Sequence, residues 1–184
     1  MNYKVTFLVC LLVVIATGCA GPNPNPGERI TDMAWTSNDF KRAFEIAKPR
    51  AEAGEPWAQL RLGIFYENSW GTDKDIEKAE YWYQKAAAQK SVGGWAEGKL
   101  VGSAGKPGYF NQNSDAQIAQ FNLAQLYYTN DKHLQEAKNL IEAVINGSAG
   151  KSVFFCCEFS GGRYFTQAQF LDLKQKIDQK LDGQ

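Results

Sequence analysis

The chain has few of the residues that build disulfide frameworks and metal sites. It holds one histidine and four cysteines among 184 residues. Cys10 and Cys19 lie near the amino terminus, so the rest of the chain carries only the adjacent pair Cys156 and Cys157. A framework of several disulfide bridges is therefore excluded, and no second pair of Cys or His residues supports a metal site.

The chain also lacks an excess of charge of either sign. Lys and Arg together number 20, as do Asp and Glu, which excludes attraction of nucleic acid by bulk charge. The glycines at 93, 94, 98 and 102 do not indicate a phosphate-binding loop, because they are not followed by a Lys-Ser or Lys-Thr pair. The one histidine, His133, falls at a polar turn and is expected on the surface. We therefore predict a protein that is not an enzyme, with no catalytic residue, no cofactor, no metal and no nucleic-acid partner.

The one long apolar run lies at the amino terminus, where residues 1–18 have the build of a signal peptide. Lys4 precedes twelve apolar residues, 5–16, which are too few to span a hydrocarbon core of about 30 Å comfortably. The ending Ala-Thr-Gly-Cys at 16–19 resembles a bacterial lipobox. The resemblance implies that diacylglycerol is attached to the Cys19 thiol, that cleavage occurs before Cys19, and that the new amino terminus is acylated. An ordinary signal peptide cut near Ala20, or a short membrane anchor, remains the alternative.

Residues 19–37 are predicted to be a flexible linker. The stretch AGPNPNPGE at 20–28 is rich in Pro, Asn and Gly, and we expect it to form neither a helix nor a core. Position 20 is Ala rather than Asp. By resemblance to Gram-negative lipoproteins, this favours sorting to the outer membrane, with the domain on the periplasmic face.

Residues 38–184 are predicted to form one all-α domain built from a repeated helical hairpin. Residues 119–127 copy residues 58–66 at a shift of 61, and the helix that follows is copied at a shift of 58. The longer step contains the Gly-rich insert 90–113. In the first helix of each pair, apolar residues occupy two opposite faces, which predicts a helix packed between neighbours. The aligned positions of the second helices are Ala79, Trp82, Tyr83 and Ala86; Ala137, Leu140, Ile141 and Val144; and, upstream, Ala43, Ile46 and Ala47.

These residues resemble the Sel1-like repeat, a relative of the tetratricopeptide repeat. The resemblance implies a short α-solenoid of helix-turn-helix pairs that binds other proteins. The second copy lacks the Gly-rich turn and the Trp-Tyr pair, so it is a degenerate repeat. The matching residues are Ala51, Gly54, Ala58, Gln59, Leu62, Gly63, Tyr66, Asp75, Lys78, Ala79, Trp82, Tyr83, Lys85, Ala86 and Ala87.

Local features complete the predicted domain. Asp73 or Asp75 can cap the second helix of the first repeat, and Pro49 is expected to kink or end a helix near Lys48 unless it follows the family pattern. Residues 152–165, SVFFCCEFSGGRYF, are expected to form a compact loop or a short strand pair. Beyond them, Thr166 and Gln169 form a capping box before an apolar stripe that predicts a capping helix. The stripe consists of Phe170, Leu173, Ile177 and Leu181.

Two groups of residues are candidates for function. Cys156 and Cys157 either pack as small apolar side chains, form a strained vicinal disulfide with a redox role, or bind a metal. Glu80, Tyr81, Gln84 and Lys85 are expected on the solvent side of their helix. The candidate protein-binding residues are the aromatic ones expected at turns or on outward faces, each of which could instead serve local packing: Trp57, Trp70, Tyr81 and Trp95.

The sequence therefore predicts a lipid-anchored periplasmic protein that binds another protein. A narrower interpretation is an immunity protein that neutralises a phospholipase-like toxin delivered by a type VI secretion system, as some small Sel1-like lipoproteins resemble such proteins. An envelope component is another candidate partner, with the protein in a structural role. A redox protein that uses Cys156 and Cys157 is the alternative from a different class.

Overall fold

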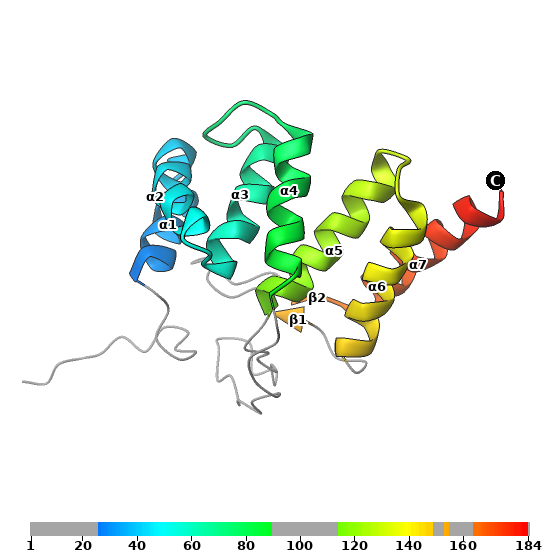
Figure 1. Ribbon diagram of the computed structural model, residues 1–184. Helices are drawn as coiled ribbons and strands as arrows, with labels where there is room; N and C mark the ends of the chain where they lie inside the picture. The colour runs from blue at the N-terminus through cyan, green and yellow to red at the C-terminus, as the bar shows by residue number, and fades with distance from the viewer. Residues whose placement is uncertain (1–25, 90–113, 149–152, 155–163, 184) are drawn as a thin grey trace, which may run out of the picture.

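The computed structural model describes residues 26–89, 114–148, 153–154 and 164–183, which form a row of helices with one short strand pair (Figure 1). Each helix packs mainly against the helix before it and the helix after it, as in a solenoid. The predicted all-α solenoid with a C-terminal helix is confirmed. The elements are α1 (Pro26–Thr36), α2 (Phe40–Glu52), α3 (Pro56–Asn68), α4 (Ile76–Ala87), α5 (Ser114–Thr129), α6 (Leu134–Ser148), β1 (Val153–Phe154), β2 (Tyr164–Phe165) and α7 (Gln167–Asp182).

The hairpin α3–α4 is defined by its two ends and its turn. Pro56 is the first residue of α3, where its missing N–H costs nothing. The helix ends at Asn68; the next residue, Ser69, adopts a left-handed conformation, and Gly71 continues the turn with φ of 73°. Of the two aspartates that could cap α4, Asp75 does so by accepting a hydrogen bond from the Lys78 amide.

The two helices of this hairpin cross closely at Gly63. A Cβ atom placed on Gly63 would lie within 3.0 Å of three carbons of the Tyr83 ring, so only glycine leaves room for that ring. Tyr83 is fully buried, and its hydroxyl donates a hydrogen bond to Glu67 at 2.6 Å. Burial raises the pKa of both groups, that of Tyr83 well above its ordinary value. Ring and glycine thus fix the distance between α3 and α4.

The repeat that the sequence predicted is visible in the burial pattern. In α4, Ala79, Tyr83 and Ala86 are fully buried and Trp82 is half-buried. The aligned residues of α6 behave alike, with Ala137, Ile141 and Val144 fully buried and Leu140 half-buried. In α2, Ala43 and Ala47 are fully buried and Ile46 is half-buried. The same register thus places the second helix of all three hairpins against the core.

The predicted linker at 19–37 is wrong for its second half, because residues 26–36 form α1. Pro26 opens this helix, a position that suits proline. Ala34 is buried, and the Trp35 ring lies 5.2 Å from the Phe65 ring and 5.1 Å from the Trp70 ring. These contacts with the first repeat hold the segment as a helix. The rest of the predicted linker and the signal peptide, residues 1–25, lie outside the described residues.

Pro49 does not end its helix near Lys48, which was one of the outcomes expected without the family pattern. The helix α2 runs on to Glu52 with Pro49 inside it. Ala47 and Ala51 are both buried, and the side-chain amide of Gln59 donates to the Ala51 carbonyl at 3.3 Å. Packing against α3 therefore holds the last turn despite the proline.

The carboxyl-terminal part closes the row. The expected strand pair is present, with Val153 opposite Phe165 in an antiparallel register. The capping box of Thr166 and Gln169 is confirmed at the start of α7. The predicted stripe faces inward, with Phe170, Leu173 and Ile177 buried and Leu181 packed beside them.

Lysine ion pairs occur within α7 and between α7 and its neighbours. Ion pairs link Lys138 of α6 to Asp178 of α7, Lys174 to the same Asp178, and Lys180 to Asp131 at the turn between α5 and α6.

Within the described ranges, no helix combines the length and the hydropathy needed to cross a membrane.

Candidate protein-binding surface

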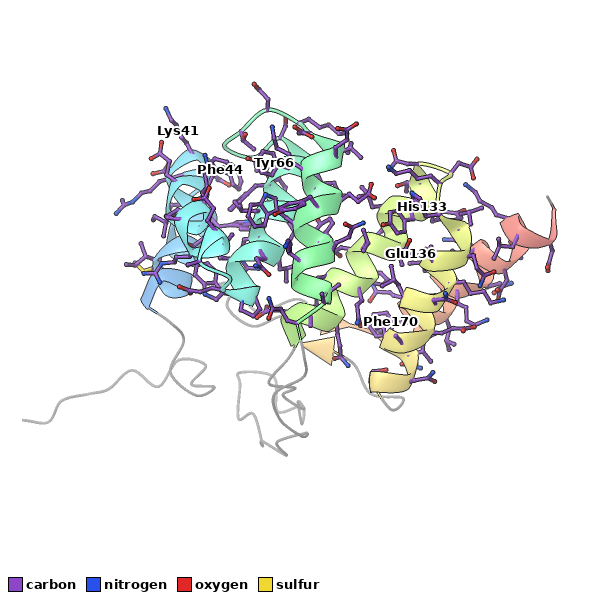
Figure 2. All side chains as sticks on the ribbon, in the orientation of Figure 1. Lys41, Phe44, Tyr66, His133, Glu136 and Phe170 are labelled. Atoms are coloured by element: carbon purple, nitrogen blue, oxygen red, sulfur yellow. The ribbon has the colours of Figure 1, made fainter. Side chains whose placement is uncertain are left out.

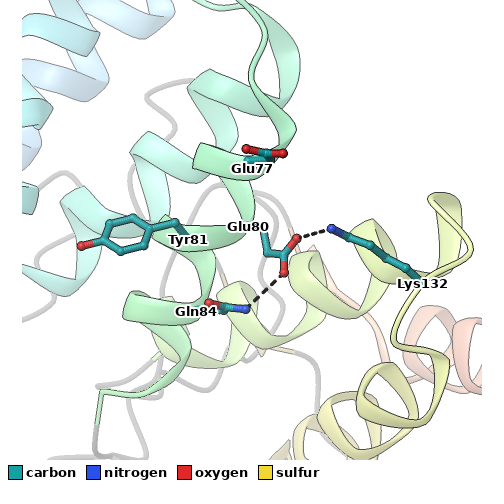
Figure 3. A pocket seen from close by; sticks show the side chains of 5 residues that line it. All are labelled: Glu77, Glu80, Tyr81, Gln84 and Lys132. Carbon is teal, nitrogen blue, oxygen red and sulfur yellow. Dashed lines mark hydrogen bonds and ion pairs between the residues drawn. The ribbon is translucent and has the colours of Figure 1, made fainter.

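The outer side of α4 carries an open pocket at the junction of the two repeats. The pocket has a volume of about 300 Å³ and draws its side chains from α4 and from the turn between α5 and α6 (Figure 3). Figure 3 shows Tyr81 on one side of Glu80 and Lys132 on the other. The residues that line it are Glu77, Glu80, Tyr81, Gln84 and Lys132.

The spacing of the α4 residues explains why they share one face. Positions 77, 80, 81 and 84 follow the i, i+3, i+4, i+7 pattern, which places side chains above one another on a helix. The opposite stripe contains the fully buried Ala79, Tyr83 and Ala86. The outer stripe is therefore oriented by the packing of the inner one.

Glu80 is the centre of a polar network that joins the two repeats. Its carboxylate accepts hydrogen bonds from the Tyr127 hydroxyl at 3.2 Å and from the Gln84 amide at 3.3 Å, and it pairs with the Lys132 ammonium at 2.7 Å. Gln84 also donates to the Tyr127 oxygen at 2.9 Å. Because Tyr127 belongs to α5 and Lys132 to the following turn, these contacts fix α4 against the second repeat.

The Tyr127 hydroxyl acts as a hydrogen-bonding group and not as an acid or base near neutral pH. Burial, together with the nearby carboxylates of Glu80 and Glu136, raises the pKa of Tyr127 to about 12, while the hydrogen bond from Gln84 opposes this shift. The phenol therefore keeps its proton and donates a hydrogen bond to Glu80. The network is a structural joint between the repeats.

Two other groups of the pocket are open to solvent. The Tyr81 side chain is 49% exposed, and its ring lies 5.0 Å from the Trp82 ring. The Lys85 ammonium lies 5.5 Å from the centre of the Tyr81 ring. In the part of the chain that the structure describes, the Glu77 carboxylate has neither a hydrogen bond nor an ion pair. Tyr81 and Glu77 are thus available to a partner.

The predicted binding residues have different positions in the structure. Tyr81 is exposed, as expected. Trp57 is only 6% exposed and donates its indole N–H to Glu55 at 2.7 Å, so its expected outward position is wrong. Trp70 is half-buried, with its ring stacked 5.1 Å from the Phe40 ring. Trp57 thus belongs to the buried core, and Trp70 packs against the rings of Phe40 and Trp35. Trp95 lies outside the described residues, as do Cys19, Cys156 and Cys157.

His133 is exposed, which confirms the expected surface position (Figure 2). Its ring lies 5.0 Å from the Tyr127 ring. Among the described residues there is no group of three or more His, Cys, Asp or Glu side chains placed to hold a metal ion.

Sequence reasoning did not single out Glu77, Gln84 or Lys132 as site residues. The signal for the two α4 residues was present, because they share the solvent stripe with Tyr81. Lys132 gave no such signal, because its pairing with Glu80 depends on how α4 meets the turn after α5.

Comparison with known proteins agrees with the observed hairpins. The model of the Sel1 repeat family matches residues 58–91 and 117–142. A similar protein is the chitin synthase regulator SKT5 of Saccharomyces cerevisiae, which is 46% identical over 52 residues, or 28% of this chain. The match covers only 8% of the length of that protein. No solved structure matches the chain. The two matched segments coincide with the hairpins α3–α4 and α5–α6, and Sel1 repeats generally mediate protein–protein interactions.

Proposed function

We propose that this protein is a lipid-anchored interaction module that binds another protein through the outer face of α4. The observation that supports this best is the half-exposed Tyr81 beside the unpaired Glu77, over a joint in which Glu80 holds two repeats together. Half-exposed aromatic rings with polar neighbours are typical of the residues that dominate protein interfaces.

The rigidity of the joint favours binding. Tyr127 and Lys132 hold α4 from the second repeat, and Gly63 and Tyr83 hold it from α3. A surface that is already ordered loses little conformational entropy when a partner docks, so more of the contact energy appears as affinity. The repeats thus serve as a stiff support for one exposed stripe.

The proposed tether consists of lipid on Cys19 and a short spacer. Residues 20–25 separate Cys19 from the start of α1 at Pro26. Six residues span at most about 20 Å, so the solenoid would stay close to the membrane surface. Several acyl chains, at roughly 0.8 kcal/mol per buried CH₂, are sufficient for stable anchoring. We place the protein on the periplasmic face of the outer membrane, where the search for a partner is confined to that surface.

The partner can be a toxin, as in the immunity interpretation, or an envelope component. Both interpretations, and the redox alternative at Cys156 and Cys157, stay predictions.

The proposal is tested by site-specific photocrosslinking in the bacterium that encodes the protein. The full chain would carry p-benzoylphenylalanine at position 81, which keeps an aromatic ring there, or at position 45, an exposed residue of α2. We expect an adduct of discrete mass at position 81 and none at position 45. Equal adducts at both positions, or none at position 81, would contradict a docking role of α4.

A further inference from the structure

The charges that line the pocket leave one carboxylate without a counterion. Glu77 and Glu80 are acidic and Lys132 is basic, so these residues carry a net charge of −1. The Lys132 ammonium lies 2.7 Å from Glu80, and these two charges neutralise each other. The remaining charge is that of Glu77, on the exposed side of α4.

An anionic ligand does not suit this pocket. The ammonium of Lys132 is engaged with Glu80, and that of Lys85 lies over the Tyr81 ring. Within the lining, a phosphate or carboxylate would meet the unbalanced negative charge of Glu77, because the charge of Lys132 is balanced by Glu80; Lys85 keeps its positive charge but is not part of the lining. The pocket is therefore complementary to positive charge.

The Tyr81 ring is placed to accept a cation as well. Lys85 already lies 5.5 Å from the ring centre, which is within the range of cation–π contacts. Tyr66 and Tyr128 of the same chain hold Lys78 and Lys180 in the same way, at 5.4 Å and 4.4 Å. Because Tyr81 is 49% exposed, its ring also offers area to a group from outside.

Glu77 and Tyr81 are four residues apart on α4, so their side chains are neighbours with Cβ atoms roughly 5–6 Å apart. A planar guanidinium can pair with the carboxylate through its N–H groups and stack on the aromatic ring at the same time, whereas an ammonium is a compact point charge. The pocket volume of about 300 Å³ is at the small end of the roughly 300–1,000 Å³ range of ligand sites, which suits a single side chain.

We propose that this pocket receives an arginine side chain of the partner protein, held by the Glu77 carboxylate and the Tyr81 ring. The inference rests on the proposed docking role of α4 and specifies the chemistry that this surface recognises. Lys85 competes with the incoming guanidinium for the ring. The joint of Glu80, Tyr127 and Lys132 positions the two binding groups without contacting the guest.

The test uses the full chain labelled with 3-fluorotyrosine, purified in a neutral detergent and observed by fluorine NMR. The Tyr81 resonance is assigned with Tyr81→Phe, since the chain has eight tyrosines. The probes are N-acetyl-arginine amide and N-acetyl-citrulline amide, which share a shape but differ in charge. We expect the Tyr81 resonance alone to shift with the arginine probe, with a dissociation constant on the order of 100 mM, and not to shift with the citrulline probe.

Two variants test the roles of the individual groups. Glu77→Gln should weaken binding of the arginine probe about two- to fivefold, the range for one exposed ion pair. Lys85→Ala should tighten it, because a competing cation is removed. Glu45→Gln, at an exposed position of α2, is the matched control and should leave the binding unchanged. Circular dichroism of each variant checks that the helices are intact.

Equal responses to the two probes, an unchanged affinity in Glu77→Gln, or weaker binding in Lys85→Ala would each overturn the proposal. These results are separable from a failure of the proposed function. If crosslinking at position 81 captures a partner while the arginine probe fails to bind, the docking role stands and the arginine inference falls. If neither experiment gives a signal, both fall.

Discussion

Replacing Gly63 by alanine tests the close crossing of α3 and α4 directly. The added methyl group would lie within 3.0 Å of three carbons of the Tyr83 ring, which is fully buried and therefore has no room to move aside. A shift of the ring would also stretch the 2.6 Å hydrogen bond from Tyr83 to Glu67. The substitution changes no charge, so any effect reports on packing.

The expected magnitude follows from three terms of known sign. Overpacking a filled core costs about 1–3 kcal/mol, and loss of the hydrogen bond from Tyr83 to Glu67 costs about 1 kcal/mol. Alanine has a higher helix propensity than glycine by about 1 kcal/mol, and this gain offsets part of the loss from overpacking and from the hydrogen bond. We therefore expect Gly63→Ala to lower the free energy of unfolding by about 1–3 kcal/mol.

Urea unfolding monitored by circular dichroism measures this difference. The matched control is Gly147→Ala in α6, where the added methyl group meets only the flexible end of the Gln117 side chain, at 2.7 Å. That variant should be as stable as the parent or up to about 1 kcal/mol more stable. In a Tyr83→Ala background, Gly63→Ala should no longer destabilise. If Gly63→Ala and Gly147→Ala behave alike, the close crossing is not where the structure places it.

Three further predictions concern a turn, a buried phenol and the tether. Gly71→Ala should destabilise by about 2–4 kcal/mol in urea unfolding, because alanine is strained at φ of 73° and its Cβ would collide with the Phe40 carbonyl. The pKa of Tyr127 is raised to about 12 in the folded chain, so the stability that it contributes is present below pH 10 and is lost as the pH rises toward 12; unfolding curves from pH 9 to 12 should show a shallower decline for Tyr127→Phe. At pH 7 the same variant should lose about 1 kcal/mol through its missing hydrogen bond. Cys19→Ser should abolish incorporation of a clickable palmitate analogue in cells and move the protein out of the membrane fraction, and unchanged labelling would contradict the lipid anchor.

Much of the fold could be predicted because the chain repeats itself. The aligned positions of α2, α4 and α6 have the same burial. Because the same pattern recurs in the sequence, the helix predicted in one repeat supported the helices predicted in the others. The helix α1 was missed because the Pro- and Gly-rich stretch before it dominates the local composition. Its helical state depends on Ala34 and Trp35 packing against residues that are distant in the sequence.

The candidate site could be predicted only in part, for a similar reason. The exposure of Tyr81 follows from helical periodicity, since Tyr83 on the opposite side has to be buried. The half-buried position of Trp70 depends on the rings of Phe40 and Trp35 in other elements, which no local pattern reveals. The indole N–H of the buried Trp57 donates to Glu55, two residues before it. The contact between Glu80 and Lys132 likewise exists only once the two repeats are packed.

The account depends most on the outer face of α4 being the surface that meets the partner. The most direct measurement is the yield of the in-cell adduct from p-benzoylphenylalanine at position 81 in three backgrounds: the parent chain, Glu77→Gln and Glu45→Gln. We predict one adduct of fixed mass whose yield falls in Glu77→Gln and is unchanged in Glu45→Gln. An adduct yield that is the same in all three backgrounds, or the absence of any adduct from position 81, would contradict the account.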